Sequence, residues 1–149
     1  MAHFNPGPGD DSIPFGKNEY RRSTVGLKYD TVQIFKDAVP EEPGQPGEKI
    51  LQSGEVLAKI TSGPGKDMWG PYQIDATDGR GDLANVDGVN DTFDAFKLRE
   101  RNIEAASCYS GTLDQQKCFI RDATGARIEL TDAVAEALVA KKHIEITFR

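Results

Sequence analysis

The spacing of apolar and polar residues along the chain predicts a mainly β protein. The segment TVGLKYDTVQIFK, residues 24–36, alternates on both sides of the pair Asp30-Thr31, which is typical of two short strands or one bent strand. Short apolar runs separated by Gly-containing turns continue this pattern through the rest of the chain, with a turn at Ser53-Gly54 and a tight hairpin at Ala123-Thr124-Gly125. Asp78-Gly79 and Asp87-Gly88 bracket an expected loop. The apolar runs predict strands at residues 49–52, 55–61, 72–76, 95–107, 117–121, 126–130 and 143–148.

One helix is expected, at residues 132–142, directly before the last strand. Val134, Ala137 and Leu138 follow helical spacing, and Thr131 is suited to the N-cap position. The pattern therefore predicts a small β-barrel or β-tulip-like domain with one short C-terminal helix, preceded by an extended N-terminal arm.

Pro and Gly residues divide the chain into three expected parts. Residues 1–23 form the extended N-terminal arm, residues 24–48 hold short strands and a Pro/Gly-rich connection, and residues 49–149 form the β-rich domain. The arm has too few apolar residues to fold alone, so it is either a flexible terminus or a segment that becomes ordered against a partner. In the second interpretation its partner-binding residues are Phe4, Ile13, Pro14, Phe15 and Tyr20.

Composition narrows the classes of function. The chain has 149 residues, of which 38% are hydrophobic and 28% charged, as in ordinary globular proteins. With 18 Lys and Arg against 24 Asp and Glu, the net charge is −6, which argues against nucleic acid as a partner. The apolar runs are too short to span a membrane, and the first residues lack the basic and apolar regions of a signal peptide.

The sequence predicts no enzyme, no cofactor and no metal site. Its histidines are His3 and His143, and neither a GxSxG nor an HExxH motif is present. The acidic residues between Asp75 and Asp94 do not follow the spacing of a calcium loop, so solvated turns are the expected interpretation. The tripeptide Arg80-Gly81-Asp82 matches the motif of adhesion ligands, but it is short enough to occur by chance.

Two further groups of residues have two interpretations each. Cys108 and Cys118 flank an expected turn at Ser110-Gly111, where they are either a disulfide or a pair of small buried hydrophobic residues. Met68, Trp69 and Tyr72 follow a Gly-Pro-Gly loop. They either form a candidate interface for protein contacts or cover one end of the barrel.

Three segments together resemble a known family. They are ILQSGEVLAKIT at residues 50–61, Pro71-Tyr72 with the following turn at Asp78-Gly79, and ELTDAVAEALVAKKHIEI at residues 129–146. This combination resembles the lambda-type head decoration, or capsid cement, proteins of tailed bacteriophages. The resemblance covers residues 49–149, and the chain departs from it in residues 1–48 and in a polar insert between residues 78 and 94.

The resemblance implies a structural protein of the virion, made in the host cytoplasm and placed on the outer capsid surface. Such a protein forms a homotrimer at local threefold positions of an expanded icosahedral head, where it clamps neighbouring major capsid subunits. The resemblance also implies that the arm joins a capsid strand by β-augmentation.

An alternative family is suggested by GEVLAKI, which also resembles a strand of biotinyl and lipoyl carrier domains. Lys66-Asp67-Met68 is the nearest counterpart of their modified lysine, but it lacks the family's spacing. A different small β adhesion or binding module is a further alternative.

Overall fold

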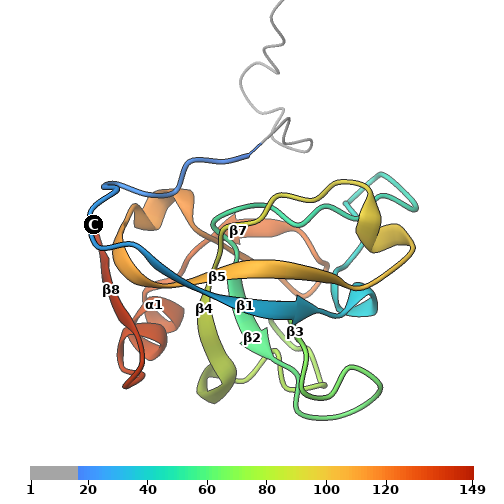
Figure 1. Ribbon diagram of the computed structural model, residues 1–149. Coiled ribbons are helices and arrows are strands. Elements are labelled where there is room, and N and C mark those ends of the chain that lie inside the picture. Colours follow the sequence, from blue (N-terminus) through green and yellow to red (C-terminus); the bar gives the residue numbers. More distant parts are fainter. Residues whose placement is uncertain (1–16) are drawn as a thin grey trace, which may run out of the picture.

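The computed structural model describes residues 17–149, which form a mainly β structure with one short α-helix (Figure 1). The strands are β1 (Lys28–Ile34), β2 (Val56–Lys59), β3 (Trp69–Pro71), β4 (Val86–Asn90), β5 (Ile103–Leu113), β6 (Phe119–Arg121), β7 (Arg127–Glu129) and β8 (Glu145–Phe148). The helix α1 spans Asp132–Val139, and four 3₁₀ helices are η1 (Lys36–Ala38), η2 (Leu83–Asn85), η3 (Lys97–Arg99) and η4 (Gln115–Lys117).

Five strands close into a barrel in the order β1-β3-β2-β4-β5, because β5 also pairs with β1. The β1–β5 pairing is antiparallel and long, from Lys28 opposite Ser110 to Ile34 opposite Ile103. Outside this ring, β8 adds to β5 in parallel, and β6 and β7 form a separate antiparallel hairpin. The expected fold class, a small β-barrel with one short C-terminal helix, is confirmed.

The core consists of two apolar clusters that meet at β2. Val56 and Ala58 belong to the larger cluster, whereas Leu57 between them belongs to the smaller one, as the alternation of a strand requires. Val134 and Leu138 bring α1 into the larger cluster, and α1 packs against β4, β8 and η2. Both faces of β2 are therefore covered, so the run of apolar residues in β2 reflects burial on two sides.

Several expected elements are confirmed by the structure. β6 and β7 form the hairpin expected around Ala123-Thr124-Gly125, and β8 is the expected terminal strand. The helix begins at Asp132 as expected but ends at Val139, three residues earlier than predicted.

Three strand predictions were wrong in place or extent, and one strand, β4, was missed. Residues 49–52 contribute only an isolated bridge between Leu51 and Asp94, and the strand expected at 72–76 lies earlier, as β3. The strand expected at 95–107 starts at Ile103, because Asp94 accepts hydrogen bonds from the backbone N–H of residues 97 and 98 and initiates η3. β4, which the sequence suggested to be loop, contains Gly88. A Cβ there would lie 2.1 Å from the Ser107 hydroxyl oxygen, so a weak strand former is required where β4 crosses β5.

The sequence placed residues 24–48 in a separate part of the chain, and the structure places β1 in the same barrel as the strands that follow residue 49. The Pro/Gly-rich connection is not simply exposed, because the side chains of Val39 and Glu42 are buried.

Candidate functional site

Residues 17–22 attach the N-terminal segment to the barrel and form the first candidate site. Arg21 bridges Leu113 at the end of β5, the Arg22 N–H donates to the Thr112 carbonyl at 3.0 Å, and the Asp114 N–H donates to the Tyr20 carbonyl at 2.8 Å. We call residues 17–22 the anchor. These contacts hold the anchor in place on the barrel (Figure 1).

Tyr20 is the apolar centre of the anchor. Its side chain has no exposed surface, and its hydroxyl donates a 2.7 Å hydrogen bond to Asp91, which also forms a 3.0 Å ion pair with Lys17. Burial and this hydrogen bond raise the pKa of Tyr20, so the phenol remains a donor. Tyr20, one of the predicted partner-binding residues, therefore lies in the core of its own barrel.

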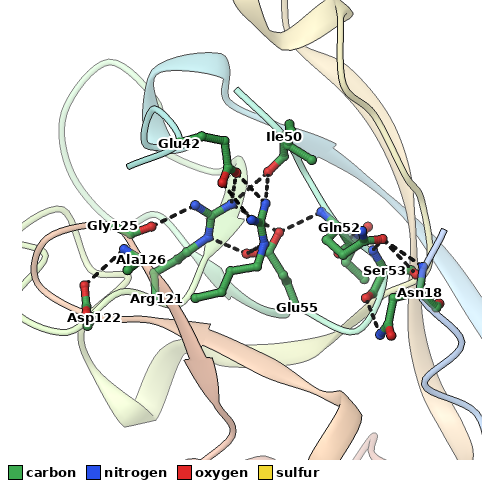
Figure 2. Close-up of polar contacts among 12 residues, drawn as sticks. Asn18, Glu42, Ile50, Gln52, Ser53, Glu55, Arg121, Asp122, Gly125 and Ala126 are labelled. Carbon is green, nitrogen blue, oxygen red and sulfur yellow. Dashed lines mark hydrogen bonds and ion pairs between the residues drawn. The ribbon is translucent and has the colours of Figure 1, made fainter. Parts of the chain in front are cut away.

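Asn18 fixes the backbone of the anchor to two separate turns (Figure 2). Its N–H donates to the Gln52 side-chain oxygen at 3.0 Å, and its amide group donates to the carbonyls of Ser53 at 3.1 Å and Lys117 at 2.9 Å. In return, the Ser53 hydroxyl donates to the Asn18 carbonyl. The backbone N–H, the backbone carbonyl and the side-chain NH₂ group of Asn18 thus all hold the chain in place.

Gly54 allows the anchor to approach this closely. Its φ is +95°, and a Cβ at this position would lie 2.7 Å from the Lys117 carbonyl oxygen and 3.2 Å from the Tyr20 Cβ. A side chain would require both a strained backbone and displacement of the anchor. The Ser53-Gly54 turn, read from the sequence as a simple strand connection, therefore has a second role.

Behind the anchor lies a buried ion cluster of two carboxylates and two guanidinium groups (Figure 2). It consists of Glu42, Glu55, Arg121 and Arg127. Glu55 and Arg121 have no exposed side-chain surface, and Glu42 and Arg127 are 2% and 13% exposed. Because two negative charges face two positive charges, the cluster is neutral as a whole, which limits the cost of burying it.

Arg121 has the largest number of contacts in the cluster. Its guanidinium binds both carboxylate oxygens of Glu55 and donates to the carbonyls of Gly125 at 2.9 Å and Ile50 at 2.8 Å. Burial opposes ionisation of Glu55, but the charges of Arg121 and Arg127 outweigh it, so the pKa of Glu55 lies below its ordinary value. The carboxylate is therefore ionised at neutral pH.

The ion cluster and the anchor form one continuous polar network. Glu55 accepts a 2.8 Å hydrogen bond from the Gln52 N–H, and the side chain of Gln52 accepts from Asn18. Through Glu42 the same network also holds the Pro/Gly-rich connection. Sequence reasoning missed this network, because its members are scattered from residue 18 to residue 127 and are brought together only by the barrel.

The second candidate site is a surface pocket of about 240 Å³ beside Trp69. The indole N–H donates to Asp87 at 2.7 Å, His143 Nε2 lies 2.7 Å from the other oxygen of Asp87, and the Lys59 amine lies 5.5 Å from the ring centre. Lys141 completes the charged lining. We call these five residues the Trp69 pocket.

The structure separates the three residues predicted as a second interface. Of Met68, Trp69 and Tyr72, only Trp69 lines the Trp69 pocket. The Met68 sulfur accepts a hydrogen bond from Asn102, and Tyr72 is buried in the larger core cluster with its hydroxyl donating to the Gly81 carbonyl. Trp69 and Tyr72 therefore lie in different environments and do not form one exposed patch.

The remaining candidate residues are placed as follows. Arg80 is 8% exposed and donates to the carbonyls of Ala38 and Pro71, so the Arg80-Gly81-Asp82 tripeptide is not presented as a ligand. Cys108 and Cys118 are both buried and free, and the turn expected between them lies within β5. Lys66 is exposed in the connection between β2 and β3.

The acidic residues of the insert are distributed over separate contacts. Asp78 binds Arg80, Asp82 caps η2, and Asp94 accepts hydrogen bonds from two backbone N–H groups of η3. Within residues 17–149 no group of three or more His, Cys, Asp or Glu side chains is arranged to hold a metal ion. Phe4, Ile13, Pro14 and Phe15, the other predicted partner-binding residues, lie outside the described part of the chain.

No helix among the described residues has the length and apolar character needed to cross a membrane. Comparison of the chain with protein-family models, with curated proteins and with solved structures found no match.

Proposed function

We propose that this chain is a non-enzymatic structural protein that decorates the outer surface of an expanded bacteriophage head. The observation that carries the proposal is the anchor, where residues 17–22 are fixed to the barrel by Tyr20 and by the hydrogen bonds of Asn18. A rigid body that presents a terminal segment from a fixed point is suited to gripping a neighbouring subunit.

The segments that resemble decoration proteins lie together in the structure, which supports the proposal. Residues from all three of them, including Val56, Tyr72 and Leu138, pack in the larger apolar cluster. The resemblance therefore covers one contiguous part of the core and not three unrelated surface stretches.

The buried ionisable groups also favour a structural role over a catalytic one. Glu55 and Arg121 are fully buried and paired with each other, so a substrate does not reach them. The Trp69 pocket contains a His–Asp pair, but its lining contains no Ser, Thr or Cys that could act as a nucleophile. The role of the buried Glu55–Arg121 network is instead to keep the anchor in one position.

In this proposal the segment that contacts the major capsid protein lies within residues 1–16. Sixteen residues reach at most about 50–60 Å when fully extended, which is enough to cross onto a neighbouring subunit. The segment adds to a capsid strand by main-chain hydrogen bonding, and the barrel forms a homotrimer at local threefold positions.

A deletion tests the proposal, provided that it leaves the anchor intact. Removing residues 2–16 should retain the fold and lower occupancy on expanded, undecorated heads by more than tenfold in a dilution series. Deleting residues 2–20 is unsuitable, because it also removes the hydrogen bonds of Asn18 and the buried ring of Tyr20.

A matched control is Val25→Ser. This variant changes an apolar side chain that is 80% exposed, and it should bind heads like the unchanged protein. Equal occupancy of the truncated and full-length proteins would contradict the role of the segment, and failure of the full chain to bind any head would contradict the proposed function.

A further inference from the structure

We propose that the Trp69 pocket receives residues 10–15 of a neighbouring copy of this chain, so that copies associate head to tail. This inference rests on the proposed homotrimer and names the surfaces that build it. The remaining residues, 1–9, are then free to reach the capsid.

The anchor and the pocket lie at opposite ends of β4. Asp87, near the start of this strand, lies in the pocket, whereas Asp91, just after its end, binds Tyr20 and Lys17 of the anchor. Four residues of strand separate them by about 13 Å. Each copy therefore presents its terminal segment at one end and an open pocket at the other.

The pocket carries two lysines, Lys59 and Lys141, in a chain whose net charge is −6. Lys59 and His143 are about half exposed, and Lys141 lines the same pocket. Two acids face these groups. Asp87 is already bound by Trp69 and His143, and Asp67 lies 4.0 Å from the Lys59 amine at the limit of an ion pair. The Lys141 amine donates to the Ala84 carbonyl, and the Lys59 side chain remains about half exposed, so both ammonium groups stay beside the indole ring for an acidic ligand.

The segment 10–15 has the complementary chemistry. Its sequence, DDSIPF, places the two carboxylates of Asp10 and Asp11 directly before the apolar side chains of Ile13 and Phe15. An acidic pair beside the lysines with an apolar residue against the indole ring would use both features of the pocket.

A second groove, of about 350 Å³ between α1 and β8, is less suitable for this segment. Val139 and Phe148 give it an apolar wall, but Asp132 and Glu136 lie on its rim. Asp10 and Asp11 would meet like charges there, and like charges disfavour association. The charge pattern therefore selects the Trp69 pocket.

A contact between different surfaces of two identical copies is heterologous, and it closes into a ring when the rotation permits. The proposed homotrimer is such a ring, with three equivalent contacts between a segment and a pocket. Each contact is small, so association in solution should be weak and should strengthen on a shell that holds the copies together.

Fluorescence provides a direct test, because Trp69 is the only tryptophan in the chain. The probe is a synthetic peptide of residues 8–16, PGDDSIPFG, which contains no tryptophan. Added to dilute full-length protein, it should change the Trp69 emission in a saturable way. A peptide with Asp10→Asn and Asp11→Asn should bind at least tenfold more weakly, and this comparison leaves the protein itself unchanged.

Protein variants locate the binding site. Lys59→Gln with Lys141→Gln should weaken binding of the unchanged peptide at least tenfold, whereas Glu136→Gln in the α1–β8 groove should leave it unaltered. A peptide that does not alter Trp69 emission, or that responds equally to all of these variants, would overturn the proposal.

Sedimentation of the full-length protein tests whether the partner is a second copy. The mean mass should rise with protein concentration, fall in 1 M salt, where the Debye length is about 3 Å, and remain monomeric with Asp10→Asn and Asp11→Asn. A monomeric unchanged protein whose pocket excludes the peptide would show that the segment fills its own pocket, which contradicts the proposal. An unchanged full-length protein that binds heads but does not associate with itself would overturn this inference alone. An unchanged protein that associates with itself but binds no head would overturn only the proposed function.

Discussion

The guanidinium of Arg121 and the carboxylate of Glu55 form an ion pair, joined at 3.3 Å between Nη2 and Oε2, in which neither side chain has exposed surface. The pair connects the turn before β2 to the β6–β7 hairpin, and through Gln52 it supports the anchor. Its loss should therefore affect both the stability of the barrel and the position of the N-terminal segment.

The first prediction concerns this pair. Glu55→Gln leaves the Arg121 charge buried without its main partner, so the free energy of unfolding should fall by about 3–5 kcal/mol. Urea denaturation followed by circular dichroism measures the change. The control is Glu48→Gln, because the pair of Glu48 with Arg99 is about 40% exposed on both sides and should contribute less than about 1 kcal/mol. Equal effects of the two substitutions would contradict the role of the cluster.

The second prediction concerns acid stability. Because the pKa of Glu55 is lower in the folded protein than in the unfolded chain, the unfolded state takes up this proton first as the pH falls. The contribution of ionised Glu55 to the free energy of unfolding should be fully present above about pH 4.5. It should be lost as the pH falls through the lowered pKa that Glu55 has in the folded protein. Urea midpoints between pH 7 and pH 3 should fall more steeply in the unchanged protein than in Glu55→Gln. Parallel curves would show that Glu55 is not linked to the acid transition.

The third prediction separates the contributions that the ring and the hydroxyl group of Tyr20 make to stability. Tyr20→Phe keeps the buried ring but removes the hydrogen bond to Asp91, which should lower the free energy of unfolding by about 1.5–3 kcal/mol. Tyr20→Ala also leaves a cavity and should cost about 3–5 kcal/mol. Thermal denaturation of both variants checks the order. A fully stable alanine variant would mean that the barrel does not need the Tyr20 ring in its core.

The sequence was sufficient for the fold class because strand alternation and turn residues are local signals. The β6–β7 hairpin and α1 were found for this reason. β4 was missed because its sequence, VDGVN, contains three weak strand formers, whose presence is explained by contacts with β2 and β5. Its identity as a strand is decided by tertiary packing.

The candidate site was less accessible from the sequence than the fold. Tyr20 is surrounded by polar and turn-forming residues, so its single apolar side chain resembled those of the preceding arm, and only the barrel shows that it is buried. Glu55 and Arg121 are 66 residues apart, and each resembles an ordinary surface charge in the sequence. Trp69 was singled out from the sequence, but its neighbours Asp87 and His143 reach it only through β4 and the end of the chain.

The fourth prediction concerns the two thiols. Burial raises the pKa of Cys108 and raises that of Cys118 to about 12, so neither forms much thiolate near neutral pH. The folded protein at pH 8 should react slowly with a thiol reagent such as Ellman's reagent, whereas the protein in denaturant should release two equivalents rapidly. Rapid labelling of the folded protein would show that this part of the core opens readily.

The last prediction concerns the packing of α1, which brings a second layer onto the barrel. Leu138 has no exposed surface and lies in the larger apolar cluster, whereas its neighbour Val139 is 41% exposed. Leu138→Ala should therefore lower the free energy of unfolding by about 2–5 kcal/mol, through lost burial and the cavity that remains. Val139→Ala tests the same helix on its other face and should change stability by less than about 1 kcal/mol, because alanine has the higher helix propensity and little surface is uncovered. If urea denaturation shows similar losses for both variants, α1 is not held on the barrel by one apolar face, and the burial of this helix must have another cause.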